Sequence, residues 1–133
     1  MYMNIIHPST SMMSLPTKIS SLETECLYGE TIQILEKKSG WAYCKLLTDN
    51  YCGWINQKAL GFLKSPSHRV LSIRSFLYKK KDVKSYSIHY VPMGAQLAVK
   101  KVQCDWAEIF LPSKNNYQIA YIPTKHIVEI DNR

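Results

Sequence analysis

Cysteine and histidine side chains are the groups of this sequence that could do chemistry, as a nucleophile with its base or as metal ligands. The 133 residues hold four of each: Cys26, Cys44, Cys52 and Cys104, with His7, His68, His89 and His126. No two cysteines have the two-residue spacing of a zinc or redox site, and no histidine keeps a regular spacing to any of them. The sequence therefore predicts no catalytic residue, no metal site and no cofactor.

The redox state of the thiols is a related question. Three cysteines fall in the first half of the chain and one in the second, so neither half pairs off evenly. Cys44 and Cys52 flank a short turn, and a disulfide across that hairpin is one possibility. The other, which we expect, is that they are buried, reduced thiols.

Positive charge marks a second kind of candidate site. Lysine and arginine give a net charge of +7, and the only run is Lys79, Lys80 and Lys81. Such a run is usually a solvated loop; the alternative is a patch for an anionic partner. Nucleic-acid modules of the OB or RRM type interleave basic and aromatic residues on one strand face. These lysines fall in a predicted loop apart from the tryptophans, so we expect no nucleic-acid partner.

Composition narrows the class of protein. With 46% hydrophobic and 20% charged residues, the chain reads as an ordinary globular protein. No apolar run is long enough to span a bilayer, so we expect no membrane span. The N-terminus lacks a basic region followed by an apolar core, as a signal peptide would have. We therefore expect a cytoplasmic location.

A β-hairpin is the element that must position the central residues. Residues 41–47 and 51–55 are rich in apolar, β-branched and aromatic side chains, and the turn between them contains Asp49 and Asn50. Asparagine tolerates positive φ, and aspartate bonds its own backbone two residues on, so both favour a turn.

The same hairpin occurs twice in the sequence. Trp41-Ala42 recurs 65 positions on as Trp106-Ala107, and Trp54-Ile55 recurs 67 positions on as Tyr121-Ile122. The change of offset places a two-residue insertion in the second hairpin turn, around residues 114–116. Self-similarity at a fixed spacing, with the gap in a loop, predicts a duplicated unit.

Each copy reads as a small all-β domain. We expect a first domain over residues 10–61, a linker over 62–68 and a second domain over 69–130. Short strands in about 60 residues are best accommodated in a partly open barrel. Residues 1–10 read as a loose arm, and 18–26 and 77–92 as long loops. The predicted strands and closing helical turns are, in order, 12–15, 31–36, the hairpin, turn 56–60, 69–76, 96–102, 106–111, 117–122 and turn 124–127.

These residues carry a resemblance to a known family. Residues 27–31 (Leu-Tyr-Gly-Glu-Thr), Gly40-Trp41 and the hairpin 49–55 look like a bacterial SH3 domain. Residues 66–76, with Lys84-Ser85 and 93–95, resemble the second SH3-like domain in the N-terminal half of NlpC/p60-type murein peptidases. Those enzymes cleave the bond between γ-D-glutamate and a diamino acid in cell-wall peptides. The resemblance covers about residues 12–130 and implies two tandem SH3-like barrels.

The resemblance also bears on the site. The family's catalytic domain should follow the second unit with a cysteine in an Asp-Cys-Ser-Gly setting, and no cysteine here has that setting. We therefore expect the catalytic domain to be absent and the chain not to be an enzyme by itself. An aromatic residue of the family's first SH3-like domain helps to enclose the free N-terminal L-alanine. The matching position is Tyr51, with Asp49 nearby and Trp54 in the same motif; Asn50 stands where the family usually has glycine.

Each of these candidate site residues could also have a purely structural role. Tyr51 also fits a half-buried strand residue, Asp49 a turn former, and the tryptophans a core. The function we expect is recognition of murein peptides, together with an NlpC/p60 catalytic domain in cis or in trans. One alternative is a free-standing SH3-like module for proline-rich or other peptides; it calls for acidic loops, whereas the second long loop is lysine-rich. Another is adhesion to an anionic wall polymer through residues 79–84.

Overall fold

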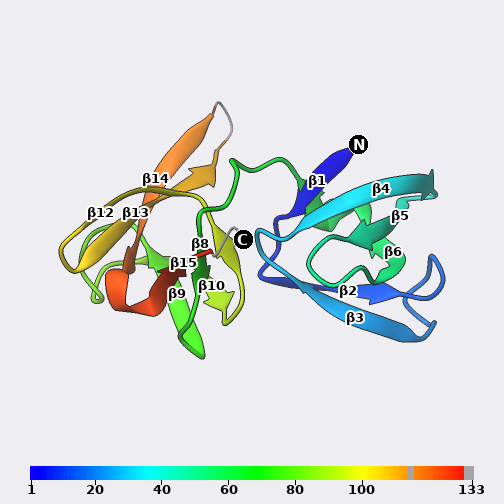
Figure 1. The fold of residues 1–133 in the computed structure, drawn as a ribbon, viewed down its shortest axis with the longest axis horizontal. Helices are drawn as coiled ribbons and strands as arrows, with labels where there is room; N and C mark the ends of the chain where they lie inside the picture. Colours follow the sequence, from blue (N-terminus) through cyan, green and yellow to red (C-terminus); the bar gives the residue numbers. More distant parts are fainter. Residues whose placement is uncertain (114–115, 131–133) are drawn as a thin grey trace. The chain divides into compact units, whose positions relative to one another are not determined.

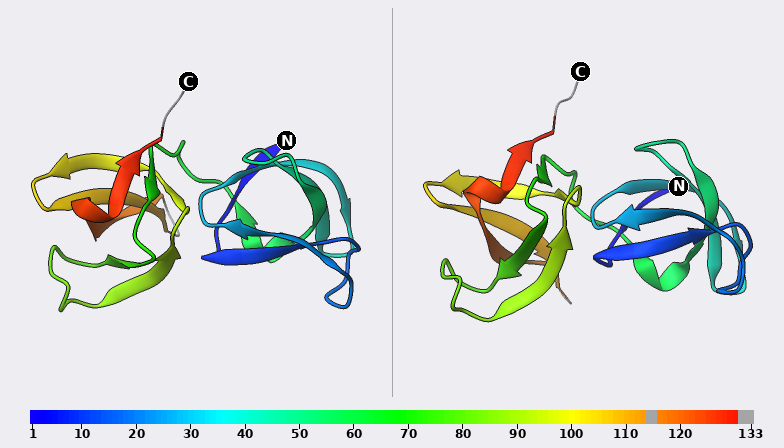
Figure 2. Two further views of the ribbon diagram at one scale, coloured as in Figure 1. Left: turned by 60° about the horizontal axis from the view of Figure 1, so that its bottom comes forward. Right: turned by 90° about the horizontal axis from the view of Figure 1, so that it is seen from below.

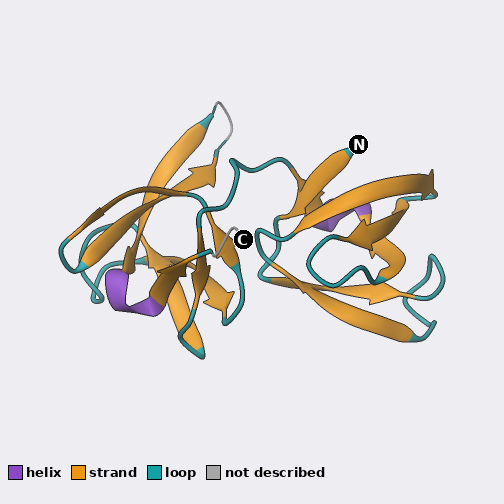
Figure 3. Ribbon diagram, viewed as in Figure 1, coloured by secondary structure: helices purple, strands orange, loops and turns teal. Residues whose placement is uncertain are grey.

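The computed structural model describes residues 1–113 and 116–130 of the chain. It divides into two compact units, Met1–Phe62 and Leu63–Arg133 (Figure 1). In the described residues the regular structure is β-strand apart from two single-turn 3-10 helices (Figure 3). The expected all-β class of SH3-like barrels is confirmed.

The first unit is one antiparallel sheet that curls around its own core (Figure 2). Its strand order is β3-β2-β6-β5-β4-β1-β7. Strand β5 alternates between half-buried and buried residues, because successive side chains point to opposite faces. The elements are β1 (Tyr2–Ile5), β2 (Ser9–Met13), β3 (Leu22–Leu27), β4 (Thr31–Lys38), β5 (Trp41–Leu46), β6 (Cys52–Asn56), η1 (Gln57–Ala59) and β7 (Leu60–Gly61).

The second unit has a five-stranded sheet, β10-β9-β14-β13-β12, and a three-stranded sheet, β11-β8-β15. Its buried residues include Leu77, Val91, Leu97, Ile109 and Ile122. The elements are β8 (His68–Val70), β9 (Arg74–Tyr78), β10 (Ser87–Pro92), β11 (Gln96–Leu97), β12 (Val99–Gln103), β13 (Trp106–Pro112), β14 (Tyr117–Pro123), η2 (Thr124–His126) and β15 (Ile127–Glu129).

The predicted duplication extends to individual backbone hydrogen bonds. The amide of Ile5 donates to the carbonyl of Glu30 at 3.0 Å, and 65 positions on the amide of Val70 donates to that of Ala95 at 2.9 Å. Strands β2 and β3 correspond at the same offset to β9 and β10 over their whole lengths. Gly29 and Gly94 both have positive φ, at 86° and 94°. The two units are therefore copies of one fold.

The structure corrects several expected segments. Residues 1–10 are no loose arm, because β1 pairs with β4 and β7. The segment 18–26 is no long loop, because it contains most of β3, an edge strand whose residues are exposed or half-buried except Cys26. The loop expected over 77–92 is shorter, because β9 runs to Tyr78 and β10 begins at Ser87. The strand expected over 69–76 is two strands, as is the one over 96–102. The predicted insertion at 114–116 falls largely outside the described residues.

Candidate functional site

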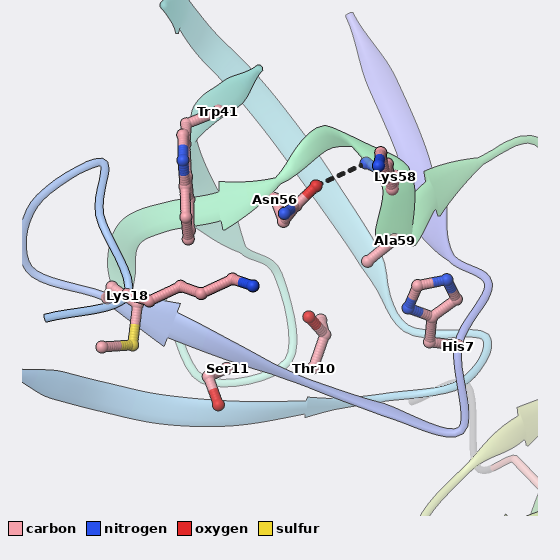
Figure 4. Close-up of a pocket in the computed structure, with 9 residues that line it drawn as sticks. His7, Thr10, Ser11, Lys18, Trp41, Asn56, Lys58 and Ala59 are labelled. Atoms are coloured by element: carbon pink, nitrogen blue, oxygen red, sulfur yellow. Dashed lines mark hydrogen bonds between the residues drawn. The ribbon is translucent and has the colours of Figure 1, made fainter. Parts of the chain in front are cut away.

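A groove of about 410 Å³ lies on the first unit beside Trp41, and we call it the Trp41 groove (Figure 4). Its walls come from β2, the β2–β3 loop, the start of β5, the end of β6 and η1. In Figure 4 the side chain of Lys18 extends from the loop across the hollow. The lining residues are His7, Thr10, Ser11, Met13, Lys18, Trp41, Asn56, Lys58 and Ala59.

The backbone around Trp41 is held on both sides. A turn precedes it, with Ser39 and Gly40 at positive φ of 50° and 84°. The amide of Gln57 donates to the carbonyl of Gly40 at 2.9 Å. The side-chain amide of the same Gln57 donates to the carbonyl of Trp41 at 2.9 Å. Because the strand start is fixed in this way, the half-buried indole forms a wall of the groove in a defined place.

One end of the groove is the short helix η1. Asn56 is its N-cap, and its side-chain oxygen accepts the amide of Lys58 at 2.9 Å (Figure 4). Asn56 is also the register partner of Trp41 across the hairpin. Ala59 is buried, whereas Lys58 is exposed. The cap thus anchors the backbone that presents the Lys58 ammonium at the groove.

The opposite wall is β2, which depends on a glycine in β6. A Cβ added at Gly53 would lie 2.5 Å from Cγ of Met12 and 2.8 Å from the carbonyl oxygen of Met13. Met13 is in register with Trp54, so β2 crosses β6 at this point. Only a residue without a side chain lets the two strands approach so closely.

The described residues that line the groove carry basic side chains and no acidic ones. Three of its lining residues, His7, Lys18 and Lys58, are exposed and basic or ionisable, and none of the described lining residues is acidic. The neighbouring carboxylate of Glu25 accepts the hydroxyl of Ser11 at 2.7 Å. A hollow with an indole wall and ammonium groups suits a ligand that carries carboxylates.

The residues predicted from the sequence lie at the other end of β6. Tyr51 is 49% exposed, and its amide donates to the carboxylate of Asp49 at 3.2 Å, so this pair is brought together. Trp54 is half-buried and packs on Tyr43, with ring centroids 5.3 Å apart. Because side chains alternate along an extended chain, Trp54 and Tyr51 start toward opposite faces. Neither of them, nor Asp49, lines the Trp41 groove.

Sequence reasoning missed the groove itself. Its residues come from segments far apart in the chain, and most are polar residues without a local pattern. Two signals were present. Trp41 follows a glycine turn, and the Trp41 and Lys58 pair recurs as Trp106 and Lys125 in the repeat.

The second unit has a hollow in the equivalent place, with a volume of about 610 Å³. Trp106 and Lys125 occupy the positions of Trp41 and Lys58, while Val83 stands where the first unit has Lys18. Asp105 also lines this hollow. The duplicated fold therefore builds the same hollow twice, with different chemistry.

The lysine run lies in the loop between β9 and β10, as expected. Lys79 lies over the ring of Tyr86, with 5.9 Å to its centroid, and Lys81 lies 5.8 Å from that of Tyr121. Cation–π contacts of this kind are weak at exposed positions. The run is therefore set beside aromatic rings of the second unit.

The four cysteines are free thiols; Cys44 is buried as expected, whereas Cys52 is only half-buried, and Cys26 is buried and Cys104 exposed. Burial is the main cause that raises the pKa of Cys26 and of Cys44, each to about 12, so neither is a nucleophile at neutral pH. Cys52 pairs with Lys45, whereas the buried Cys44 pairs with Gly53. Cys44 and Cys52 thus lie on opposite faces of the hairpin, which is no geometry for a disulfide.

Among residues 1–113 and 116–130, no three or more His, Cys, Asp or Glu side chains gather as they would around a metal ion. The described part of the chain contains no helix long and apolar enough to cross a membrane.

Residues 12–60 match the family model of the bacterial dipeptidyl-peptidase SH3 domain. No curated protein sequence matches the chain. The crystal structure of an NlpC/P60 family protein from Bacillus cereus ATCC 10987 superposes with a TM-score of 0.76 at 15% identity. That match covers 98% of this chain and 56% of the other, so the chain spans about half the length of that protein.

Two structures from Trichomonas vaginalis are more distant. NlpC2 matches at 14% identity and a TM-score of 0.39, covering 96% of this chain and 47% of its own. NlpC1 matches at 14% identity and 0.40, covering 95% and 44%. These two scores are too low to support an argument. The predicted resemblance to the SH3-like region of NlpC/P60 proteins is confirmed by the family model for residues 12–60 and by the fold for nearly the whole chain.

Proposed function

We propose that this protein is a non-catalytic recognition and docking module for murein peptides, accessory to an NlpC/P60-type catalytic domain in cis or in trans. One observation carries the proposal: the unit whose residues 12–60 match a bacterial SH3 domain has a groove with an indole wall and a basic lining. Binding in a concave site with few, well-placed polar groups is the usual way in which such a module selects a ligand.

The charge of the groove fits the chemistry of murein peptides. A γ-linked glutamate leaves its α-carboxylate free, and a diamino acid such as diaminopimelate adds further carboxylates. Lys58 and Lys18 offer ammonium groups to them, while Trp41 offers an apolar face to the peptide backbone and methylene groups. Because these lysines are exposed, each ion pair contributes little by itself, so the affinity of one unit should be low.

The hairpin tip has a separate role in this proposal. The carboxylate of Asp49 accepts the backbone amide of Tyr51, and both residues are exposed. A carboxylate and an aromatic side chain on one hairpin tip suit the free amine of the peptide's N-terminal L-alanine. An exposed tip excludes little water, so we expect this contact only where a catalytic domain covers it; Trp54, which starts toward the other face, would then support the hairpin instead of touching the ligand.

The proposal is tested by titrating the full chain with L-Ala-γ-D-Glu-diaminopimelate peptide and measuring Kd by NMR. Lys58→Ala should weaken binding several-fold, whereas Lys37→Ala, an exposed lysine of β4 outside the groove, should leave Kd unchanged. The same peptide with its glutamate α-carboxylate amidated should bind more weakly to the native chain. Absence of any shift at millimolar peptide would contradict recognition by this chain alone.

A proline-rich peptide bearing arginine serves as the comparison ligand for the alternative function. The described groove residues include no acid to meet its guanidinium groups, so it should bind less well than the murein peptide. Tighter binding of the arginine peptide would favour the free-standing peptide-binding module.

A further inference from the structure

The net charge of the protein belongs to one of its two units. Residues 1–62 hold five basic and five acidic residues and are neutral. Residues 63–133 hold twelve basic and five acidic residues, which accounts for the whole net charge of +7. A net positive charge confined to one unit of a duplicated fold favours an anionic partner for that unit.

The same unit carries a row of touching aromatic rings, which we call the aromatic strip: Tyr90, Phe76, Tyr78 and Trp106. Ring centroids are 5.9 Å apart from Tyr90 to Phe76, 6.4 Å from Phe76 to Tyr78 and 6.0 Å from Tyr78 to Trp106. All four rings are exposed or half-buried; they belong to β10, β9 and β13, and the contact between Tyr78 and Trp106 spans the intervening strand β14. The strip is therefore a continuous apolar path on the surface of one sheet.

Each end of the strip adjoins a hollow with one basic side chain in its lining. At one end Arg74 and Ile73 line a hollow of about 490 Å³ with Phe76 and Tyr90. At the other end Lys125 lines the hollow beside Trp106, together with the acidic Asp105. The loop between β9 and β10 with its lysine run, which we call the lysine loop, adds a further basic side chain beside the strip. Its Lys81 lies over the ring of Tyr121, which is the register partner of Tyr78.

The first unit shows that the fold does not require these rings. At the offset of 65, Phe76 corresponds to Ser11, Tyr78 to Met13 and Tyr90 to Glu25. In the first unit Ser11 donates to Glu25 at 2.7 Å, so the same strands pair with polar side chains at these positions. Packing of the sheet therefore does not explain the aromatic residues of the second unit.

We propose that the aromatic strip and its surrounding cations form a binding site for an acidic polysaccharide. Sugar rings have an apolar C–H face that stacks on an aromatic ring and a polar rim that remains hydrated. Carboxylate groups on such a chain would pair with Arg74, Lys125 and the lysine loop, in keeping with the charge of this unit. This site is separate from the murein-peptide groove of the first unit and does not depend on it.

The geometry of the rings favours a polysaccharide over single-stranded nucleic acid. Neighbouring rings are inclined by 65°, 55° and 89° along the strip. Two of the three pairs meet edge to face and the middle pair is tilted, so the strip does not offer a series of parallel ring faces for a run of stacked bases. In a polysaccharide, successive sugar rings turn about each glycosidic bond, so each ring can contact an aromatic side chain at a different inclination.

The test titrates the full chain with four probes of similar length at two salt concentrations. They are a hyaluronan hexasaccharide, which has both rings and carboxylates, neutral chitin hexasaccharide, a thymidine octanucleotide and hexaglutamate, which has charge without rings. The hyaluronan should bind at least tenfold more tightly than chitin or hexaglutamate, shift the indole signal of Trp106 and weaken with added salt. Equal binding of chitin or hexaglutamate, or tighter binding of the oligonucleotide, would overturn the proposal.

The first unit shows which substitutions in the aromatic strip the fold should tolerate. Phe76→Ser with Tyr90→Glu gives the second unit the polar pair of the first, and Tyr78→Met gives it the equivalent methionine. Each variant should lose tenfold or more in affinity for the hyaluronan while it keeps the native backbone spectrum. Phe62→Ala removes an exposed aromatic residue of the first unit and should change nothing. Undiminished binding by both folded strip variants would refute the site.

Discussion

A buried carboxylate in the first unit offers a sharp test of how the two copies are stabilised. Glu30 is 6% exposed, and its carboxylate accepts the backbone amide of Leu27 at 2.7 Å. In the second unit Pro92 and Ala95 occupy the two equivalent positions. Proline has no amide hydrogen to satisfy, and alanine has no carboxylate to place. We predict that each unit depends on its residues as a pair.

The magnitude follows from the hydrogen bond that is lost. Glu30→Ala leaves the amide of Leu27 without its acceptor, which should cost about 2 kcal/mol of unfolding free energy. For a domain of this size that corresponds to a fall in Tm of about 10 °C. Leu27→Pro should cost a similar amount, because it leaves the carboxylate buried without its donor. The double variant, which has the residues of the second unit, should lose only about as much unfolding free energy as one single variant. It would then be about 2 kcal/mol more stable than the sum of the two single losses predicts.

The assay is urea unfolding followed by tryptophan fluorescence in a Trp106→Phe background, in which only Trp41 and Trp54 of the first unit report. Glu30→Gln is the matched control; it keeps an acceptor oxygen and should be destabilised less than Glu30→Ala. If the effects of Leu27→Pro and Glu30→Ala simply add, the two residues do not act as a pair and the reasoning is refuted.

Three further predictions concern packing, pH and thiols. Gly53→Ala should destabilise the first unit by about 2 kcal/mol in urea unfolding, because the new methyl group meets a carbonyl on β2, and full stability would contradict that close approach. Burial, and then the neighbouring lysine, lower the pKa of His126 below its ordinary 6.5, so the unfolded state binds its proton more strongly. The unfolding free energy should therefore fall as pH drops below about 6.5, and His126→Ala should flatten this slope; an unchanged slope would refute it. Maleimide at pH 8 should label the exposed Cys104 quickly and the buried Cys26 and Cys44 only on unfolding, as mass spectrometry of the native chain would show.

Features fixed by neighbouring residues were predictable from the sequence. The turn of the first hairpin is one example: Asn50 has a φ of 64°, and Asp49 accepts the amide two residues on. The closing turn after β6 is another, since Asn56 caps η1 through its own side chain. In both places the decisive interaction spans two residues, so the local sequence determines it.

Strands at the edges and ends of the sheets were not predictable from local pattern. Strand β3 has one buried residue, so its sequence lacks the alternation of a half-buried strand. Strand β1 is four residues long and is stabilised by partners more than 25 positions away. The repeat did contain the missing information. A strand predicted at 69–76 implies one 65 positions earlier, where β1 and β2 lie.

The Trp41 groove could not be predicted from a local sequence motif. The hairpin motif drew attention to Asp49, Tyr51 and Trp54, which lie close in sequence. The hollow instead joins Trp41 to β2 and η1, which the curled sheet brings together (Figure 2). Its polar lining has no periodicity of its own, because each residue occupies a loop or a strand end.

The three tryptophans make the most direct test of the account, since each marks a different surface. Trp41 lines the groove, Trp54 belongs to the hairpin motif and Trp106 ends the aromatic strip. The measurement is the set of three indole N–H signals in a 1H–15N spectrum during titration with L-Ala-γ-D-Glu-diaminopimelate peptide. The account predicts that the Trp41 signal moves and saturates while the other two stay in place. Movement of Trp54 or Trp106 without Trp41, or no movement at all, would contradict it.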